Sequence, residues 1–237
     1  MKVRFLAAGD RALVVEFGDR IDRALSAEVL RLHASLRSSG LVETVPSFRS
    51  LMVHYDPLVT TGTALEHAIS ILLDREPGSR STGTLWRVPV CYDGEFAPDL
   101  AEVGRLTGLS PGEVVALHSA TRYHIYMLGF LPGFPYMGDL PARLALPRRA
   151  DPRVRVPTGS IAIATTLTAI YPYESPGGWH LIGATPIRLF DPERAQPALF
   201  TPGDAVQCEP VDAVAFASIK TAVDNGSYQI ASEPIAG

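Results

Sequence analysis

The stretch LGFLPGFPYMGDLP, residues 128–141, gives the strongest local indication of the fold. Three glycines, three prolines and three aromatic side chains share its fourteen positions. Because proline lacks an amide proton and glycine weakens regular elements, we expect neither a helix nor a paired strand to run through it. We predict a stiff loop after a strand that ends at Leu128, with aromatic rings held as fixed walls. A plug of aromatic side chains at one end of a barrel would give the same pattern.

The composition around this loop favours a mainly β domain. Twelve of the twenty prolines lie within residues 132–202, where they separate short apolar runs such as SIAIATT and HLIGATPIRLF. Many short strands punctuated by proline and glycine are typical of a β-barrel or sandwich. One helix is predicted ahead of it, with Ser110 as N-cap, Pro111 at the first helical position and Glu113 completing a capping box.

The first eighty residues follow a different pattern. Two strand-like runs precede a segment with helical apolar spacing, and a second strand pair precedes a second helical segment. The expected strands are residues 3–8, 12–17, 42–48 and 50–56, and the expected helices are 21–36 and 64–73. This ββαββα order predicts a small ferredoxin-like α/β domain.

Domain limits follow from composition. The polar stretch DREPGSRSTGT, residues 74–84, marks the boundary between the two domains. We predict an α+β protein with a small ferredoxin-like α/β N-terminal domain over residues 1–80, a barrel domain over 84–220 and a loosely held C-terminal tail over 221–237.

Charge and composition exclude several classes of function. The formal net charge is −4 and the pI is near 5.9, which argues against nucleic acid as the partner. No apolar run is long enough for a membrane helix, so we expect no membrane association and a cytoplasmic protein. Cys91 and Cys208 lack metal-type spacing and are expected to be reduced, and the histidines show no metal-binding pattern, so no metal is predicted.

Arginine is concentrated in RLALPRRADPRVR, residues 143–155, where Asp151 is the only acidic residue. Guanidinium groups bind carboxylate or phosphate through paired hydrogen bonds. The cluster predicts an anionic ligand or an acidic partner surface, with a solvated basic edge as the alternative. We select Arg148 and Arg149 as the residues that hold an anionic group.

The remaining candidate site residues are aromatic side chains and one histidine. Phe130, Phe134 and Tyr136 form the predicted wall, with Trp179 beside it or in the core. His118 ends the capped helix and is a candidate for proton transfer or positioning, with a hydrogen-bonded core histidine as the alternative.

Four segments carry a resemblance to a known family. They read ALHSATRYHIYMLGFLPGFPYMGDLP, PRRADPRVRVPTGSI, YPYESPGGWHLIGATPIRLFDP and PGDAVQCEP, and VPSFRSLMVHYDP adds to them near the N-terminus. The pattern, which runs from about Leu117 to Pro210, resembles the family of 5-oxoprolinase B subunits. That family is also called allophanate hydrolase subunit 1 or the Kip inhibitor family, a carboxyltransferase-domain subdomain.

The resemblance implies a fold, partners and an activity. It implies a cyclophilin-like β-barrel, a larger C subunit and a third subunit, and ATP-dependent opening of 5-oxoproline or a similar small carboxylated amide or lactam. ATP is implied for the complex and is not necessarily bound by this chain. The alternative within the family is a regulatory protein that inhibits a sensor histidine kinase. Prolyl isomerase activity would follow only from analogy with the barrel.

One segment departs from the family pattern. Where the family reads VGIGGxQTGIYP, this chain has IAIATTLTAIYP, residues 161–172. Glycines are replaced by Ala162, Ala164, Thr165 and Ala169, and a glutamine is replaced by Leu167. Added Cβ atoms would crowd a ligand lying on bare backbone, and leucine offers no amide hydrogen bonds. The likeness therefore predicts the scaffold and leaves the identity of the substrate open.

Overall fold

The structure is a computed structural model that describes residues 3–38, 43–74 and 83–235. The chain divides into two compact units, one up to residue 82 and one from residue 83 onward, which we describe separately. The predicted boundary at 74–84 lies almost entirely outside the described residues, as does position 42 of the predicted third strand.

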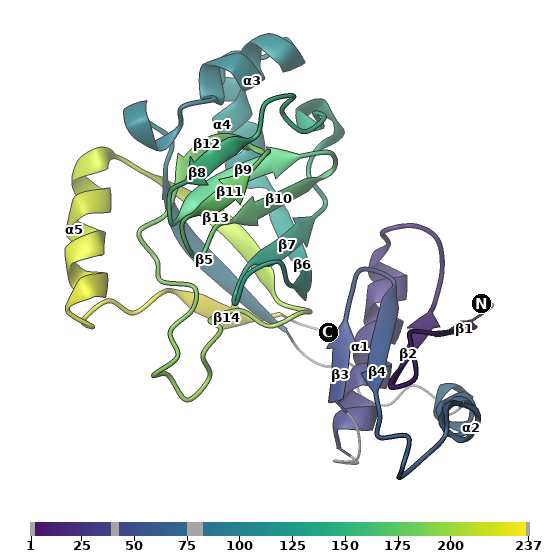
Figure 1. Ribbon diagram of the computed structural model, residues 1–237. Coiled ribbons are helices and arrows are strands. Elements are labelled where there is room, and N and C mark those ends of the chain that lie inside the picture. Colours follow the sequence, from purple (N-terminus) through teal and green to yellow (C-terminus); the bar gives the residue numbers. More distant parts are fainter. Residues whose placement is uncertain (1–2, 39–42, 75–82, 236–237) are drawn as a thin grey trace. The chain divides into compact units, whose positions relative to one another are not determined.

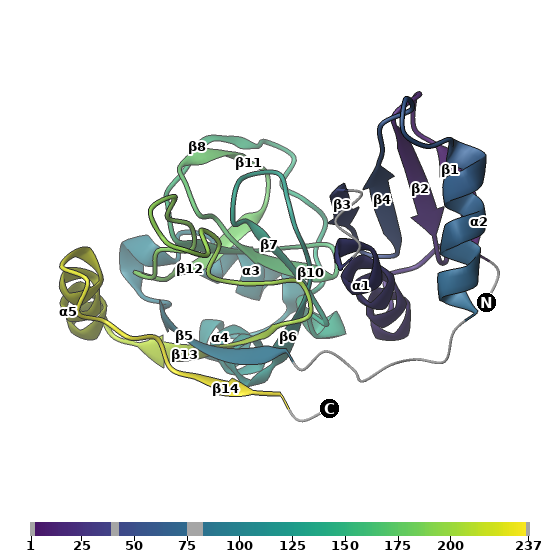
Figure 2. The ribbon, with the colours of Figure 1, turned by 90° about the horizontal axis from the view of Figure 1, so that it is seen from below.

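The N-terminal unit is a four-stranded antiparallel sheet with two helices. Its sheet has the strand order β1-β2-β4-β3. The elements are β1 (Arg4–Ala7), β2 (Ala12–Glu16), α1 (Arg23–Arg37), β3 (Glu43–Pro46), β4 (Ser50–His54) and α2 (Gly62–Leu73). Figure 2 shows both helices beside this sheet.

The core of this unit is formed by apolar side chains that alternate along the strands and recur at helical spacing along the helices. Val15 and Val53 on the sheet pack with Leu32 of α1 and Ile69 of α2, and all four are fully buried. The predicted ββαββα order is therefore confirmed in the described residues. The ferredoxin-like label is not confirmed, because that fold has the order βαββαβ.

The second unit is a closed β-barrel with helices around it (Figure 1). Its helices are α3 (Leu100–Thr107), α4 (Pro111–Ala120) and α5 (Ala213–Asp224), with short 3₁₀ turns at Gly94–Phe96 and Ala142–Leu144. Its strands are β5 (Thr84–Cys91), β6 (Arg122–Leu128), β7 (Pro135–Gly138), β8 (Arg153–Val156), β9 (Ser160–Ala164), β10 (Leu167–Ile170), β11 (Ser175–Gly177), β12 (His180–Ala184), β13 (Ala205–Val211) and β14 (Ser232–Pro234).

Seven of these strands form the ring. The order β12-β9-β10-β7-β6-β13-β5 is closed by pairing between Ala184 of β12 and Cys91 of β5. β5 and β13 run parallel, and the other neighbours in the ring are antiparallel. The mixed α+β class with a barrel is thus confirmed, while the cyclophilin-like label remains a prediction.

Helices α3 and α4 cover the barrel and share its core. Val103 of α3 and Val114 of α4 pack with Val90, Ile125 and Ile163 from the ring strands. The predicted start of α4 is confirmed by two reciprocal hydrogen bonds. The Ser110 hydroxyl accepts one from the Glu113 amide, and the Glu113 carboxylate accepts one from the Ser110 amide at 2.8 Å.

The quoted stretch is less irregular than its composition indicates. Residues 129–134 form a hydrogen-bonded loop, but β7 pairs with β6 on one side and β10 on the other. The expectation that no paired strand enters the stretch is therefore wrong. Pro135 stands at the first position of β7, where the missing amide proton is tolerated, and Gly138 stands at the last.

The chain end also differs from the predicted tail. Residues 221–224 complete α5, which lies outside the barrel, and the Phe216 ring packs against Phe96 at a centroid distance of 4.3 Å with the ring planes tilted by 40°. β14 then pairs with β5, and Glu233 forms an ion pair with Arg87 at 2.9 Å. Backbone pairing and this ion pair hold the segment to the barrel.

Candidate functional site

A cluster of aromatic rings lies on one side of the barrel. Phe134 ends the loop before β7, Tyr136 lies in β7, Tyr171 follows β10, and Trp179 precedes β12. The centroid distances are 4.9 Å for Phe134–Tyr136, 5.1 Å for Phe134–Tyr171 and 6.1 Å for Tyr136–Trp179. The structure thus brings Trp179 against the predicted wall, and Tyr171 joins it.

Phe130 belongs to this cluster but differs from the other rings in exposure. Its ring meets Phe134 edge-on at 5.5 Å, yet 62% of the residue is exposed. Its φ of 68° lies in the left-handed region, which is uncommon for a residue with a side chain. The hydrogen-bonded loop therefore holds one aromatic ring out toward solvent beside the buried rings.

The floor of the cluster contains residues that depart from the family pattern. Pairing between the strands aligns Leu181, Ala162, Ala169 and Tyr136 in one row across β12, β9, β10 and β7. Residues directly opposite one another share a face of a sheet. Ala162 and Ala169 are fully buried, so their methyl groups fill the space between Tyr136 and Leu181.

Arg148 is the exposed cation next to these rings. It makes no hydrogen bond or ion pair with any described residue, and its charge acts on the Tyr136 and Tyr171 hydroxyls. Burial raises the pKa of Tyr171 to about 12, with Arg148 acting in the opposite direction. Both phenols are protonated at neutral pH, and the exposed Arg148 guanidinium offers charged hydrogen-bond donors to an anion.

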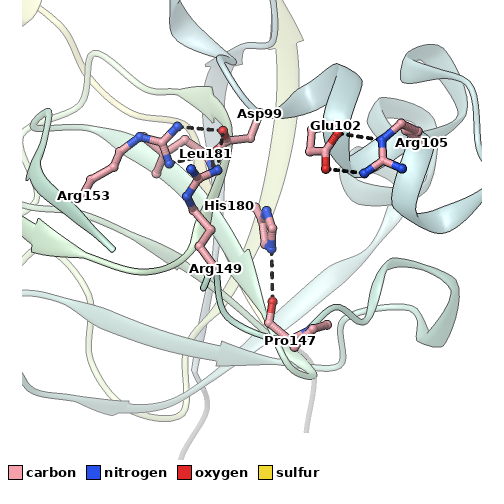
Figure 3. Close-up of polar contacts among 8 residues, drawn as sticks. All are labelled: Asp99, Glu102, Arg105, Pro147, Arg149, Arg153, His180 and Leu181. Atoms are coloured by element: carbon pink, nitrogen blue, oxygen red, sulfur yellow. Dashed lines mark hydrogen bonds and ion pairs between the residues drawn. The ribbon is translucent and has the colours of Figure 1, made fainter. Parts of the chain in front are cut away.

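Arg149 is engaged differently, although it is the next residue. Its guanidinium donates to Asp99 at 3.1 Å, and Arg153 donates two hydrogen bonds to the same carboxylate at 2.8 and 2.6 Å (Figure 3). Arg155 pairs with Glu174. Arg149 is therefore engaged by Asp99, whereas Arg148 is exposed, and the assignment of these two residues to an anion stays a prediction.

Asp99 is a site residue that sequence reasoning missed. It is the N-cap of α3, yet its side chain makes no capping hydrogen bond. Instead the carboxylate, on a residue only 4% exposed, accepts from the two arginines and from the Leu181 amide at 2.7 Å. The sequence did hold a signal, since several arginines with one nearby acid imply that a carboxylate comes from elsewhere in the fold.

His180 was also missed as a site residue. Its Nε2 donates to the Pro147 carbonyl at 3.0 Å, which leaves Nδ1 as an acceptor. That Nδ1 atom and Nε of Arg149 are both buried without a hydrogen-bond partner. In Figure 3 the His180 ring stands beside Arg149, on the side of the barrel where Glu102 and Arg105 of α3 pair with each other.

His118 lies apart from this cluster in an enclosed hydrogen-bond chain. The Tyr92 hydroxyl donates to Nδ1 at 2.8 Å, and Nε2 donates to Thr168 at 3.0 Å, whose hydroxyl donates to the Ala162 carbonyl. Burial lowers the pKa of His118 to about 3. Because both nitrogens are occupied and the ring stays neutral, the geometry favours the structural alternative over proton transfer.

Neither a metal nor a nucleotide finds a ready site here. No group of three or more His, Cys, Asp or Glu residues suited to a metal ion occurs in the described ranges. For ATP, the chain lacks the glycine-rich phosphate loop, and Arg149, Arg153 and Arg155 are already paired with carboxylates. The residues around Arg148 do not fit a triphosphate.

Over the part of the chain that is described, no helix is long and apolar enough to span a membrane.

Comparison with known proteins identifies the class to which this fold belongs. The family described as carboxyltransferase domain, subdomain C and D, matches residues 3–200, so the chain belongs to that family. Among curated relatives, the 5-oxoprolinase B subunit of Bacillus subtilis (strain 168) is 38% identical over 217 residues, covering 84% of this chain and 89% of the relative. The resemblance to the B subunits of 5-oxoprolinase is thus confirmed.

Solved structures agree with this assignment. The protein TTHA0988 has a TM-score of 0.77 at 35% identity, over 86% of this chain and 40% of that one. This chain therefore spans less than half the length of that relative. The urea amidolyase of Kluyveromyces lactis has a TM-score of 0.78 over 98% of this chain and 16% of its own, and at 19% identity it supports the fold alone.

Proposed function

We propose that this chain is the smaller, non-autonomous subunit of a cytoplasmic, ATP-dependent amidohydrolase that opens a small carboxylated amide or lactam. The supporting observation is the 38% identity to a 5-oxoprolinase B subunit across most of both chains. Because that relative is named as one subunit of its enzyme, a partner chain is expected. We propose that the partner is a larger C subunit, with a third subunit in the complete assembly.

Arg148 is proposed to bind the carboxylate of the substrate. Its guanidinium makes no ion pair with a described residue, and the protonated Tyr171 hydroxyl lies in its field. A carboxylate suits these donors because charge-assisted hydrogen bonds are stronger than neutral ones. Trp179 and Phe134, both almost fully buried, would form the apolar wall behind the substrate together with Tyr136, whose ring contacts both.

Opening of the amide bond requires activation of its carbonyl group, which ATP bound elsewhere in the complex would supply. The role left to this chain is to hold and orient the carboxylate and to exclude water from one side of the substrate. His118 is assigned a structural role, because its neutral ring joins α4 to β10 rather than facing the aromatic cluster. The filled row at Ala162 and Ala169 favours a substrate that does not need bare backbone there.

Reconstitution with the larger subunits tests the proposal. We expect ATP turnover that depends on 5-oxoproline or a related lactam, present in the mixed complex and absent from each chain alone. Arg148→Ala should raise KM at least about tenfold, as loss of a charged contact predicts. Arg155→Ala is the matched control, because that arginine is exposed and already paired with Glu174. Absence of lactam-dependent turnover, or tight binding of a histidine kinase by the isolated chain, would overturn the proposal.

A further inference from the structure

Arg148 lies between two residues that are fixed to the barrel on both sides. On one side the Pro147 carbonyl accepts a hydrogen bond from His180 at 3.0 Å. On the other side the Arg149 amide donates to the Gly178 carbonyl at 2.8 Å. The backbone that carries Arg148 is thereby held against the segment that enters β12.

The side chain of Arg149 adds a third point of attachment. Its guanidinium donates a hydrogen bond to Asp99, and the same carboxylate accepts hydrogen bonds from Arg153 and from the Leu181 amide. Asp99 is 4% exposed, and the side chains of Arg149 and Arg153 are 27% and 24% exposed. Partly buried charged hydrogen bonds of this kind keep one geometry, whereas exposed ion pairs exchange among several.

We infer that His180 and Asp99 are positioning residues that hold the backbone on either side of Arg148, so that its guanidinium is placed for a carboxylate. This inference rests on the proposed function. Because the backbone is already fixed, only the side-chain rotamer freedom of this arginine is lost when it binds a ligand, and the total cost of binding is lower. We call His180, Asp99, Arg149 and Gly178 the clamp. Through them Pro147 and Arg149, the two neighbours of Arg148 in the chain, are held in place, while Arg148 itself stays exposed.

Two buried atoms argue that the clamp does more than stabilise the fold. The Nδ1 of His180 and the Nε of Arg149 have no hydrogen-bond partner, and each such atom destabilises the folded state. A leucine at position 180 would avoid the first of these unpaired atoms. Functional sites commonly retain such locally unfavourable arrangements, because geometry there has a use beyond stability.

The test compares three variants in the reconstituted complex, with 5-oxoproline as the varied substrate. His180→Leu removes the hydrogen bond to Pro147 and should raise KM about three- to tenfold with kcat nearly unchanged, since binding rather than chemistry is affected. His180→Gln keeps an N–H donor and should restore KM to within about twofold of the original. Asp99→Asn retains the side-chain shape and should raise KM in the same way.

His33→Leu is the matched control. His33 lies in α1 of the N-terminal unit and makes one similar hydrogen bond, to Thr44 at 2.7 Å. A purely structural role for His180 predicts equal KM for the Leu and control variants, with changes in melting temperature only, and that result would overturn the inference. If Arg148→Ala raises KM while both His180→Leu and Asp99→Asn do not, the positioning role fails and the proposed function stands. If the unaltered complex shows no lactam-dependent turnover, the proposed function itself fails.

Discussion

Replacing His118 with glutamine should reduce the acid sensitivity of the barrel. Burial lowers the pKa of His118 from 6.5 to about 3, so between these values the unfolded chain binds a proton that the folded chain does not. The free energy of unfolding therefore falls as the pH drops, by up to about 1.4 kcal/mol per pH unit. Integrated from pH 7 to pH 4, the loss attributable to this one ring is about 3 kcal/mol.

Urea unfolding of both proteins at pH 7, 6, 5 and 4, followed by tryptophan fluorescence, measures this effect. The relevant quantity is the difference in pH dependence, because carboxylates titrate alike in both proteins. Glutamine is uncharged at every pH and can still bond Tyr92 or Thr168, so the variant should lose about 3 kcal/mol less than the original between pH 7 and pH 4. His118→Asn provides a second variant. Parallel pH curves for the original and both variants would refute the assignment of a buried neutral ring.

Three further substitutions, one of them with a matched control, test the local geometry by thermal unfolding. Thr165 has a φ of 53°, so Thr165→Gly should stabilise by about 0.5–1 kcal/mol, and a lower melting temperature would contradict this. Gly159 has a φ of 82° and lies against the Thr185 carbonyl, so Gly159→Ala should destabilise by at least about 2 kcal/mol. Asp99→Ala leaves two arginines unpaired and should cost about 3–5 kcal/mol, against at most about 1 kcal/mol for Glu174→Gln on the surface. Equal losses of unfolding free energy in Asp99→Ala and Glu174→Gln would show that Asp99 is not effectively buried.

Local signals in the sequence predicted the elements well. Helical spacing and the capping box at Ser110 predicted α1, α2 and α4, because these features act over a few residues, whereas α3 and α5 were not predicted. The β7 strand was missed because Pro135 and Gly138 disfavour strands in isolation, and only the neighbouring strands β6 and β10 make pairing favourable. The end of the chain was missed for the same reason, since β14 depends on β5 about 150 residues earlier.

The site was predictable in part for a related reason. Residue types indicated an aromatic wall and an anion-binding arginine, and the structure gathers Phe134, Tyr136 and Trp179. Composition could not separate Arg148 from Arg149, because the difference comes from Asp99, about fifty residues away. Nor could it show that His118 is enclosed, since its hydrogen-bond partners come from distant strands.

The parallel pairing of β5 with β13 has a consequence for synthesis in the cell. The strand that begins the barrel pairs over seven positions with one that leaves the ribosome about 120 residues later. Closure must therefore wait until β13 has emerged, whereas the N-terminal sheet, built from two hairpins joined through β2 and β4, can form much earlier. During that delay β5 lacks its parallel partner, and an apolar strand with an unpaired edge is prone to pair with other chains until the ring closes.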